Sequence, residues 1–201
     1  KSLLQKVSHI ACEDTRHSGT LVRNLESKAK LISFFQHNTK NRIPQLIQFL
    51  KDKKTVALIS DAGLPGISDP GQELISAVRD EGLEVICIPG PCAATTALVS
   101  SGFPSRRFCF EGFLPQKRKE RKKVLEKIAN ETTTTVIYEA PHKLIKLLTE
   151  LRELSGDGRP LIVCRELTKR HEQHIGKNIA EVLEYFLENK PIGECTLVLG
   201  G

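Results

Sequence analysis

The stretch from Val56 to Gly71 constrains the fold more than any other part of the chain. A short apolar run at 55–59 predicts a buried parallel strand that ends at Ser60-Asp61. A loop with three glycines and two prolines follows, and Asp69 as N-cap with Pro70 at the first helical position predicts the start of an amphipathic helix. Open α/β sheets bind ligands at strand ends of this kind, where a carboxylate lies beside a glycine-rich loop. A βα turn without a ligand would explain the same residues.

Similar βα units recur along the rest of the chain. Apolar, β-branched runs predict further strands at 8–12, 31–35, 84–88, 106–110, 132–138, 161–164 and 194–199, with amphipathic segments between them. Polar residues follow the strands in both halves. The pattern predicts an α/β protein of two lobes with a cleft between them. The segment Gly102–Ser105 predicts the boundary, which gives lobes at 1–104 and 105–201.

The composition excludes several classes of protein. The 201 residues suit one large or two small domains, and no apolar run approaches membrane-spanning length. A net charge of +6 permits a polyanionic partner without requiring one. The six cysteines include no CxxC pair, which favours reduced thiols in a cytoplasmic protein over disulfides or a metal site. The chain has no methionine and opens like a helix already under way, so we expect a preceding N-terminal segment.

Charged residues directly follow the first predicted strand. Glu13, Asp14, Arg16 and His17 together supply acid, base and anion contacts, and these four residues are candidates for catalysis. A solvated turn with Thr15 or Ser18 as N-cap is the structural alternative.

A second turn rich in Gly and Pro, Pro89–Ala94, follows the predicted strand at 84–88. Its small side chains at the start of a helix would let a ligand approach the backbone N–H groups, although tight helix–sheet packing would also explain them. Two such loops side by side at one sheet edge would form a pocket.

A basic run begins at Lys117. Six of the seven residues at 117–123 are Lys or Arg, directly after a Gly/Pro loop, and this density predicts an anion-binding flap for phosphate backbones. A charge run of this kind is also found on ordinary solvated helix faces.

Six segments, in this order, resemble one known family over essentially the whole chain. They are Glu13–His17, Ser60–Gly71, Pro89–Ala94, Phe110–Pro115, Tyr138–Lys143 and Arg165–Lys169. The chain resembles the bacterial enzymes that methylate a cytidine ribose 2′-oxygen in the decoding centre of 16S ribosomal RNA. These enzymes belong to the tetrapyrrole-methylase-like, class III superfamily of S-adenosylmethionine-dependent methyltransferases.

The resemblance implies a two-lobed α/β fold, a cytoplasmic homodimer, S-adenosyl-L-methionine in the cleft and the small ribosomal subunit as partner. The cofactor-binding residues it implies are Asp61, Ala62, Gly63, Leu64, Ser68, Pro89, Cys92, Ala93, Tyr138 and Glu139. The residues then expected to contact RNA are Lys117, Arg118, Lys119, Arg121, Lys169 and Arg170. Two departures stand out. The first strand of the N-terminal lobe and its Pro-Thr-Pro-Ile-Gly-Asn-Leu motif are absent, and Cys92 stands where many relatives have Ser.

Methylation of a hydroxyl gains from a nearby base, and the sequence leaves that base open. The candidates are Glu13, Asp14, His17, Glu139 and Glu166, with the cluster at 13–17 favoured and Arg16 expected to hold a phosphate. Two other functions also remain open. One is a tetrapyrrole (precorrin-type) methyltransferase, and the other is a non-catalytic RNA-binding relative.

Overall fold

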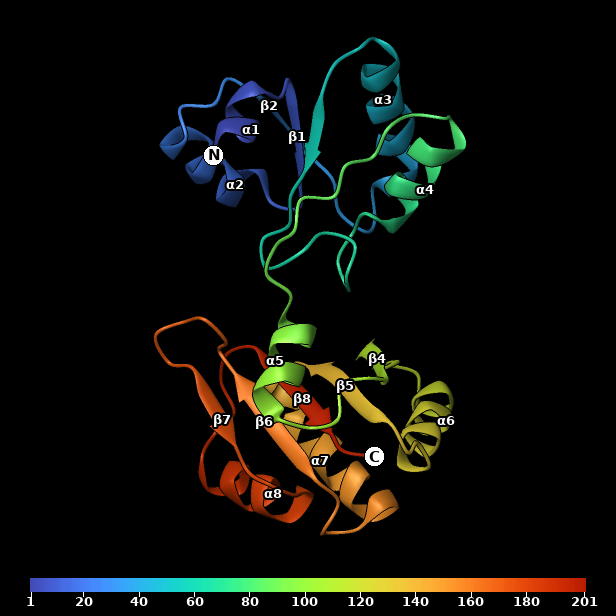
Figure 1. The fold of residues 1–201 in the computed structure, drawn as a ribbon, viewed down its shortest axis with the longest axis vertical. Coiled ribbons are helices and arrows are strands. Elements are labelled where there is room, and N and C mark those ends of the chain that lie inside the picture. The colour runs from blue at the N-terminus through green and yellow to red at the C-terminus, as the bar shows by residue number, and fades with distance from the viewer. The chain divides into compact units, whose positions relative to one another are not determined.

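A computed structural model describes residues 1–201, and the chain divides into two compact units, Lys1–Cys92 and Ala93–Gly201 (Figure 1). The boundary expected at Gly102–Ser105 is one helix too late, because α5 (Ala93–Ser101) packs against strands of the second unit. Both units are α/β, as the sequence predicts.

The first unit is built on a three-stranded parallel sheet with the order β2-β1-β3. Its strands are β1 (His9–Cys12), β2 (Lys30–Ser33) and β3 (Val56–Leu58). Its helices are α1 (Ser2–Lys6), α2 (Thr15–Asn24), α3 (Thr39–Lys51) and α4 (Gln72–Asp80). The central strand β1 is buried along its whole length, whereas β3 at the sheet edge is only half-buried.

Helices cover both faces of this sheet. On one face Ala11 packs with Leu46 of α3 and Leu74 of α4. On the other face Ile10 and Cys12 pack with residues that include Val22 of α2. Alternate residues of β1 therefore enter two separate cores, which is the geometry of a pleated strand with both faces covered.

Two predictions for the first unit are wrong. Helix α4 begins at Gln72 with Gly71 as its N-cap, so neither Asp69 nor Pro70 starts it. The residues 84–88 form no strand, and Ile86 and Ile88 are exposed. A strand requires a hydrogen-bonded neighbour, and the sheet ends at β3. High β-propensity alone does not supply one.

The second unit is built on a five-stranded mixed sheet with the order β4-β5-β8-β6-β7. Its strands are β4 (Phe108–Phe113), β5 (Thr134–Glu139), β6 (Leu161–Arg165), β7 (Gln173–Ile175) and β8 (Cys195–Leu199). Its remaining helices are α6 (Arg118–Ala129), α7 (Pro141–Ser155) and α8 (Ile179–Glu188). Only β4 and β5 pair in parallel, and the short edge strand β7 is not predicted from the sequence.

The main core of the second unit lies on one face of its sheet. Ile137, Leu197 and Val163 pack there against apolar residues of α6, α7 and α8. Helix α5 lies against β5 and β8 instead and does not cover the edge strand β4. The helices thus leave one part of the sheet, over β4, with little cover.

The cysteines fall into two groups. Cys12, Cys164 and Cys195 are buried, and burial raises the pKa of the Cys164 and Cys195 thiols to about 11. Cys87 is exposed, contrary to the expectation of a buried strand at 84–88, and Cys92 and Cys109 are half-buried. None of the helices combines the length and the apolar character that crossing a membrane requires.

Candidate active site

Two carboxylates meet at the carboxyl edge of the first unit's sheet. Strands β1 and β3 are parallel neighbours, so the residues that follow them, Glu13 and Asp61, emerge side by side. The backbone of Asp61 lies close enough to the Glu13 carboxylate to lower its pKa, against the larger effect of burial. The prediction that polar residues gather at this edge is confirmed for this pair.

The surroundings of Glu13 favour its protonated form. Partial burial is the largest cause of its raised pKa, and the nearby charges of Asp69 and Asp61 raise the pKa further. Asp69 is thus close enough to Glu13 to act on it, although the sequence predicts it only as a helix cap. A carboxylate with a raised pKa is a stronger base than an ordinary surface Glu.

The glycine-rich loop at 60–71 depends on its unusual backbone. The Ser60 hydroxyl donates to the Gly63 carbonyl oxygen at 3.0 Å. Gly71 has a φ of +149°, and a methyl group there would lie 2.8 Å from Cδ2 of Leu58. Ser68 also has a positive φ, of 57°, a conformation that costs energy for a residue other than Gly. The shape of the loop therefore depends on the absence of a side chain at Gly71.

The part of the Pro89–Ala94 turn that belongs to the first unit, residues 89–92, lies against this loop. A methyl group on Gly63 would be 3.5 Å from the Pro91 carbonyl oxygen, and one on Gly90 would be 3.7 Å from Cδ1 of Leu64. The expected juxtaposition of the two Gly/Pro-rich loops is thus present. It brings Gly63, Leu64 and the turn together, while Ala93 begins α5 of the second unit.

The other charged residues of the 13–17 cluster have separate roles. Asp14 caps α2 by accepting the Arg16 backbone N–H at 2.8 Å, and it also pairs with the Arg16 guanidinium at 2.8 Å. Arg16 holds the pKa of Asp14 far below its usual range, so Asp14 is a poor base. Asp14, not Thr15 or Ser18, is the N-cap. His17 is exposed on the first turn of α2.

An open hollow of about 470 Å³ lies beside α2. Arg16 and Arg23 line it, together with Thr15, Gly19 and Leu31 among others. The sequence pattern predicts a phosphate contact for Arg16 but none for Arg23. The signal was available, because residues seven apart lie on the same face of a helix.

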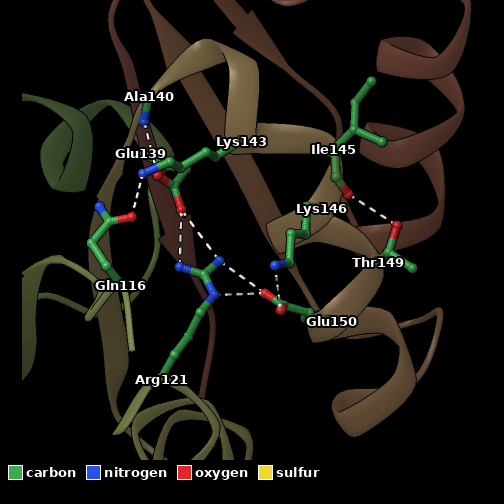
Figure 2. Close-up of polar contacts among 9 residues, drawn as sticks. All are labelled: Gln116, Arg121, Glu139, Ala140, Lys143, Ile145, Lys146, Thr149 and Glu150. Carbon is green, nitrogen blue, oxygen red and sulfur yellow. Dashed lines mark hydrogen bonds and ion pairs between the residues drawn. The ribbon is translucent and has the colours of Figure 1, made fainter. Parts of the chain in front are cut away.

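In the second unit, Glu139 and Arg121 form a buried ion-pair network (Figure 2). The Arg121 side chain is only 10% exposed and lies 3.3 Å from Glu139 and 2.8 Å from Glu150. The second Glu139 oxygen accepts the Ala140 backbone N–H at 3.0 Å. Arg121 is therefore not available for the RNA contact predicted for it, and Glu139 is neither a free base nor a free cofactor ligand.

Tyr138 connects the sheet to α5. Its hydroxyl accepts the backbone N–H of Ala94 at 2.9 Å, and its ring makes edge contacts with Phe110 and Phe113. This bond satisfies one of the amide groups that a helix N-terminus leaves without an intrahelical partner. Tyr138 thus fixes the first turn of α5, where Ala93 lies.

The remaining basic residues differ in how far their charge is already paired. Lys117 lies 3.5 Å from Glu120, while Arg118 and Lys119 are exposed and make no ion pair. Lys169 lies 3.1 Å from both Glu166 and Glu194, so two carboxylates already surround it, and Glu166 is in turn not a free base. Arg170 is exposed.

Comparison with known proteins identifies the family that the chain resembles. The family model described as Tetrapyrrole (Corrin/Porphyrin) Methylases matches residues 1–183. The protein named Ribosomal RNA small subunit methyltransferase I in Synechocystis sp. is 46% identical over 198 residues, which cover 98% of this chain and 71% of that protein. Its namesake in Thermotoga maritima is 41% identical, with coverage of 98% and 88%.

The fold has matches among solved structures as well. A uroporphyrin-III C-methyltransferase from Thermus thermophilus, solved in complex with S-adenyl homocysteine, superimposes with a TM-score of 0.62 at 18% identity and covers 99% of this chain and 88% of that one. The predicted class III methyltransferase fold is therefore confirmed. The chain belongs to the tetrapyrrole methylase family and, within it, to the group of ribosomal RNA small subunit methyltransferase I.

Proposed function

We propose that this protein is an S-adenosylmethionine-dependent methyltransferase that modifies a cytidine ribose 2′-oxygen in the decoding centre of 16S ribosomal RNA. The observation that carries the proposal is 46% identity, over nearly the whole chain, to a protein named for methylation of small-subunit ribosomal RNA. The geometry of the first unit supports the reaction type, because it offers one carboxylate with a raised pKa beside a loop shaped by glycines.

The two Gly/Pro-rich loops fit the proposed cofactor. Gly63 and Gly90 let the two loops approach each other closely, because a methyl group on either glycine would already touch the opposite loop. The residues that would hold the cofactor are Asp61, Ala62, Gly63, Leu64, Ser68, Pro89, Cys92 and Ala93, with Tyr138 fixing the start of α5. S-adenosylmethionine supplies an electrophilic methyl group when it is bound.

Glu13 is the proposed general base. The attacking hydroxyl must lose a proton, and the Glu13 carboxylate would accept it. Asp14, Glu139 and Glu166 are each held by a basic partner, which leaves Glu13 and His17 from the original candidates. Glu13 is preferred because its raised pKa brings its basicity closer to neutral pH.

Exposed cations supply the proposed RNA contacts. We assign Lys117, Arg118, Lys119 and Arg170 to this surface and leave Arg121 out, because it is buried. Lys169 contributes less because its ammonium is shared by two carboxylates. Arg16 and Arg23 around the hollow beside α2 would hold a further phosphate.

Tetrapyrrole methylation is the second candidate, and the similarity to a uroporphyrin-III methyltransferase supports it. The exposed cations at 117–119 suit the phosphates of RNA as well as the carboxylates of a tetrapyrrole, and the 46% identity to a ribosomal RNA methyltransferase favours RNA. We also propose that the protein acts in the cytoplasm as a homodimer. Analytical ultracentrifugation tests the homodimer, and a strictly monomeric protein would contradict it.

Transfer of a labelled methyl group tests the proposed activity. Purified protein and labelled S-adenosylmethionine are incubated with small ribosomal subunits, with free ribosomal RNA or with uroporphyrinogen. We expect label in the RNA of the subunit, at a ribose 2′-oxygen. Label in the tetrapyrrole alone would support the second candidate. Cofactor binding without any transfer would contradict the proposed reaction, and RNA binding alone would indicate a non-catalytic relative.

A further inference from the structure

Three phenylalanines of the edge strand β4 remain exposed. Phe108, Phe110 and Phe113 have relative exposures of 40%, 37% and 57%. Strand β4 pairs only with β5, and α5 packs over β5 and β8 without covering it. Exposed aromatic rings gathered on one strand of a folded domain mark a contact surface more often than scattered single residues do.

A β-bulge places the three rings on the same face of the sheet. Phe108 pairs with Thr134 and Phe110 with Val136, but Phe113 pairs with Tyr138 because the register shifts between Phe110 and Gly112. Successive residues of a strand alternate between faces, so Phe113 would face the opposite side from Phe110 without this shift. The extra residue, Glu111, thus brings Phe113 back beside the other rings.

Contacts with Tyr138 fix two of the rings. The Phe110 and Tyr138 ring centroids are 5.0 Å apart with an interplanar angle of 73°, and those of Phe113 and Tyr138 are 5.6 Å apart at 61°. Edge-to-face contacts of this kind hold the phenylalanine rings in place. Rings that are already ordered lose little entropy when a flat ligand stacks on them.

Cations flank the strand at both ends. Arg106 and Arg107 precede it, are exposed and make no ion pair, while Arg118 and Lys119 follow it on the first turn of α6. The only acid within the strand, Glu111, is neutralised by Lys127 at 2.8 Å. The aromatic strand therefore lies between positive charges with no unpaired negative charge in it.

We propose that Phe108, Phe110 and Phe113 form a stacking platform for unpaired bases of the RNA substrate, with the flanking arginines on its phosphates. Alternating aromatic and basic groups are what single-stranded RNA requires, because its bases stack on rings and its backbone needs cations. The inference rests on the proposed RNA substrate and adds that the protein reads an unpaired segment. If this strand instead contacted a second copy of the protein across a two-fold axis, the flanking arginines of the two copies would lie close together and repel each other.

Fluorescence anisotropy with a labelled single-stranded RNA oligonucleotide tests the platform. The key variants are Phe113→Leu, which keeps apolar bulk without a π-face, and Phe113→Trp, which restores a ring. We expect Phe113→Leu to weaken binding on the order of tenfold with an unchanged salt dependence, and Phe113→Trp to bind like the original protein. Leu187→Ala on α8 is the matched control, since Leu187 is also an exposed apolar residue of the second unit.

The variant Arg118→Ala/Lys119→Ala separates this inference from the proposed function. If it loses RNA affinity while Phe113→Leu does not, the platform is wrong and the RNA substrate stands. If neither variant changes RNA binding, the proposed RNA surface fails as well. A change of sedimentation behaviour in Phe113→Leu without a change in RNA affinity would assign the rings to a second copy and overturn the platform. Thermal unfolding and cofactor binding confirm that each variant is folded.

Discussion

Glu13 and Glu139 occupy equivalent places in two different sheets, yet their surroundings are opposite. Glu13 directly follows β1 in the first unit, and Glu139 is the last residue of β5 in the second. Partial burial raises the pKa of Glu13, and two nearby carboxylates raise it further. Glu139 is almost fully buried against the Arg121 guanidinium. The first arrangement favours proton transfer, and the second favours a fixed structure.

The difference shows that position at a strand end does not by itself make a carboxylate reactive. What decides is how far the fold buries the carboxylate and which charged groups it brings next to it. Burial and acidic neighbours destabilise the ionised form of Glu13 and increase its basicity, whereas the Arg121 guanidinium and the Ala140 N–H occupy the oxygen atoms of Glu139. Four substitution or pH experiments probe this contrast.

The largest expected effect is on catalysis by Glu13→Gln. Loss of a general base lowers kcat by about 10² to 10⁴-fold, while the Gln side chain keeps the size and shape of the Glu side chain. Single-turnover methyl transfer to small ribosomal subunits measures this, and calorimetry with S-adenosylhomocysteine should show unchanged binding.

Glu139→Gln is the matched control for that experiment. It changes the same functional group at a strand end, but within the ion-pair network instead of the proposed site. We expect lower stability and a nearly unchanged kcat for each folded molecule. An equal loss of kcat in both variants would show that the contrast between the two carboxylates does not govern catalysis.

Arg121→Ala should have the largest effect on stability. Removing the guanidinium leaves Glu139 buried and Glu150 partly buried without their cation, and breaking a buried pair in this way costs about 3–5 kcal/mol. Urea unfolding measures the loss. Lys122→Ala removes the next basic residue of the same helix, which is exposed, and should change the free energy of unfolding by less than about 0.5 kcal/mol. Similar values for the two variants would refute a structural role for Arg121.

The free energy of unfolding should depend on pH differently in the original protein and in Glu13→Gln. Its pKa is raised in the folded state, so the folded protein binds this proton more tightly than the unfolded chain does. Stability contributed by Glu13 is therefore present below the ordinary carboxyl pKa and decreases as the pH rises through the raised one. Glu13→Gln should consequently be slightly more stable than the original protein at neutral pH, and the two should converge in acid. Urea unfolding at several pH values checks this, and a less stable Glu13→Gln at neutral pH would contradict it.

Local sequence patterns predict most elements of this fold but not the partners of the charged residues. The start of α8 depends on such a local contact, because Asn178 accepts the backbone N–H of Glu181 within one helical turn. The strand expected at 84–88 fails because strand formation depends on a neighbour, which composition does not reveal.

The candidate site shows the same limit. In the sequence, Arg121 cannot be distinguished from the other cations of the basic run at 117–123. Its pairing with Glu139 depends on how α6 packs against the sheet. Asp69 reads as a helix cap, and its effect on Glu13 depends on the path of the glycine-rich loop. Long-range contacts, not residue type, decide both roles.

The smallest predicted effect concerns Tyr138, the neighbour of Glu139 in β5. Tyr138→Phe removes only the hydroxyl that accepts the Ala94 N–H, so the free energy of unfolding should fall by about 0.5–1.5 kcal/mol while the edge contacts with Phe110 and Phe113 remain. If the hydroxyl also fixes the start of α5 for the cofactor, calorimetry should show weaker binding of S-adenosylhomocysteine together with the loss of stability. Tyr185→Phe on α8 is the matched control, because its hydroxyl has no hydrogen bond within the protein. Unchanged cofactor binding in Tyr138→Phe would show that Tyr138, like Glu139, has only a structural role. The end of β5 would then differ clearly from the end of β1, where Glu13 is the proposed base.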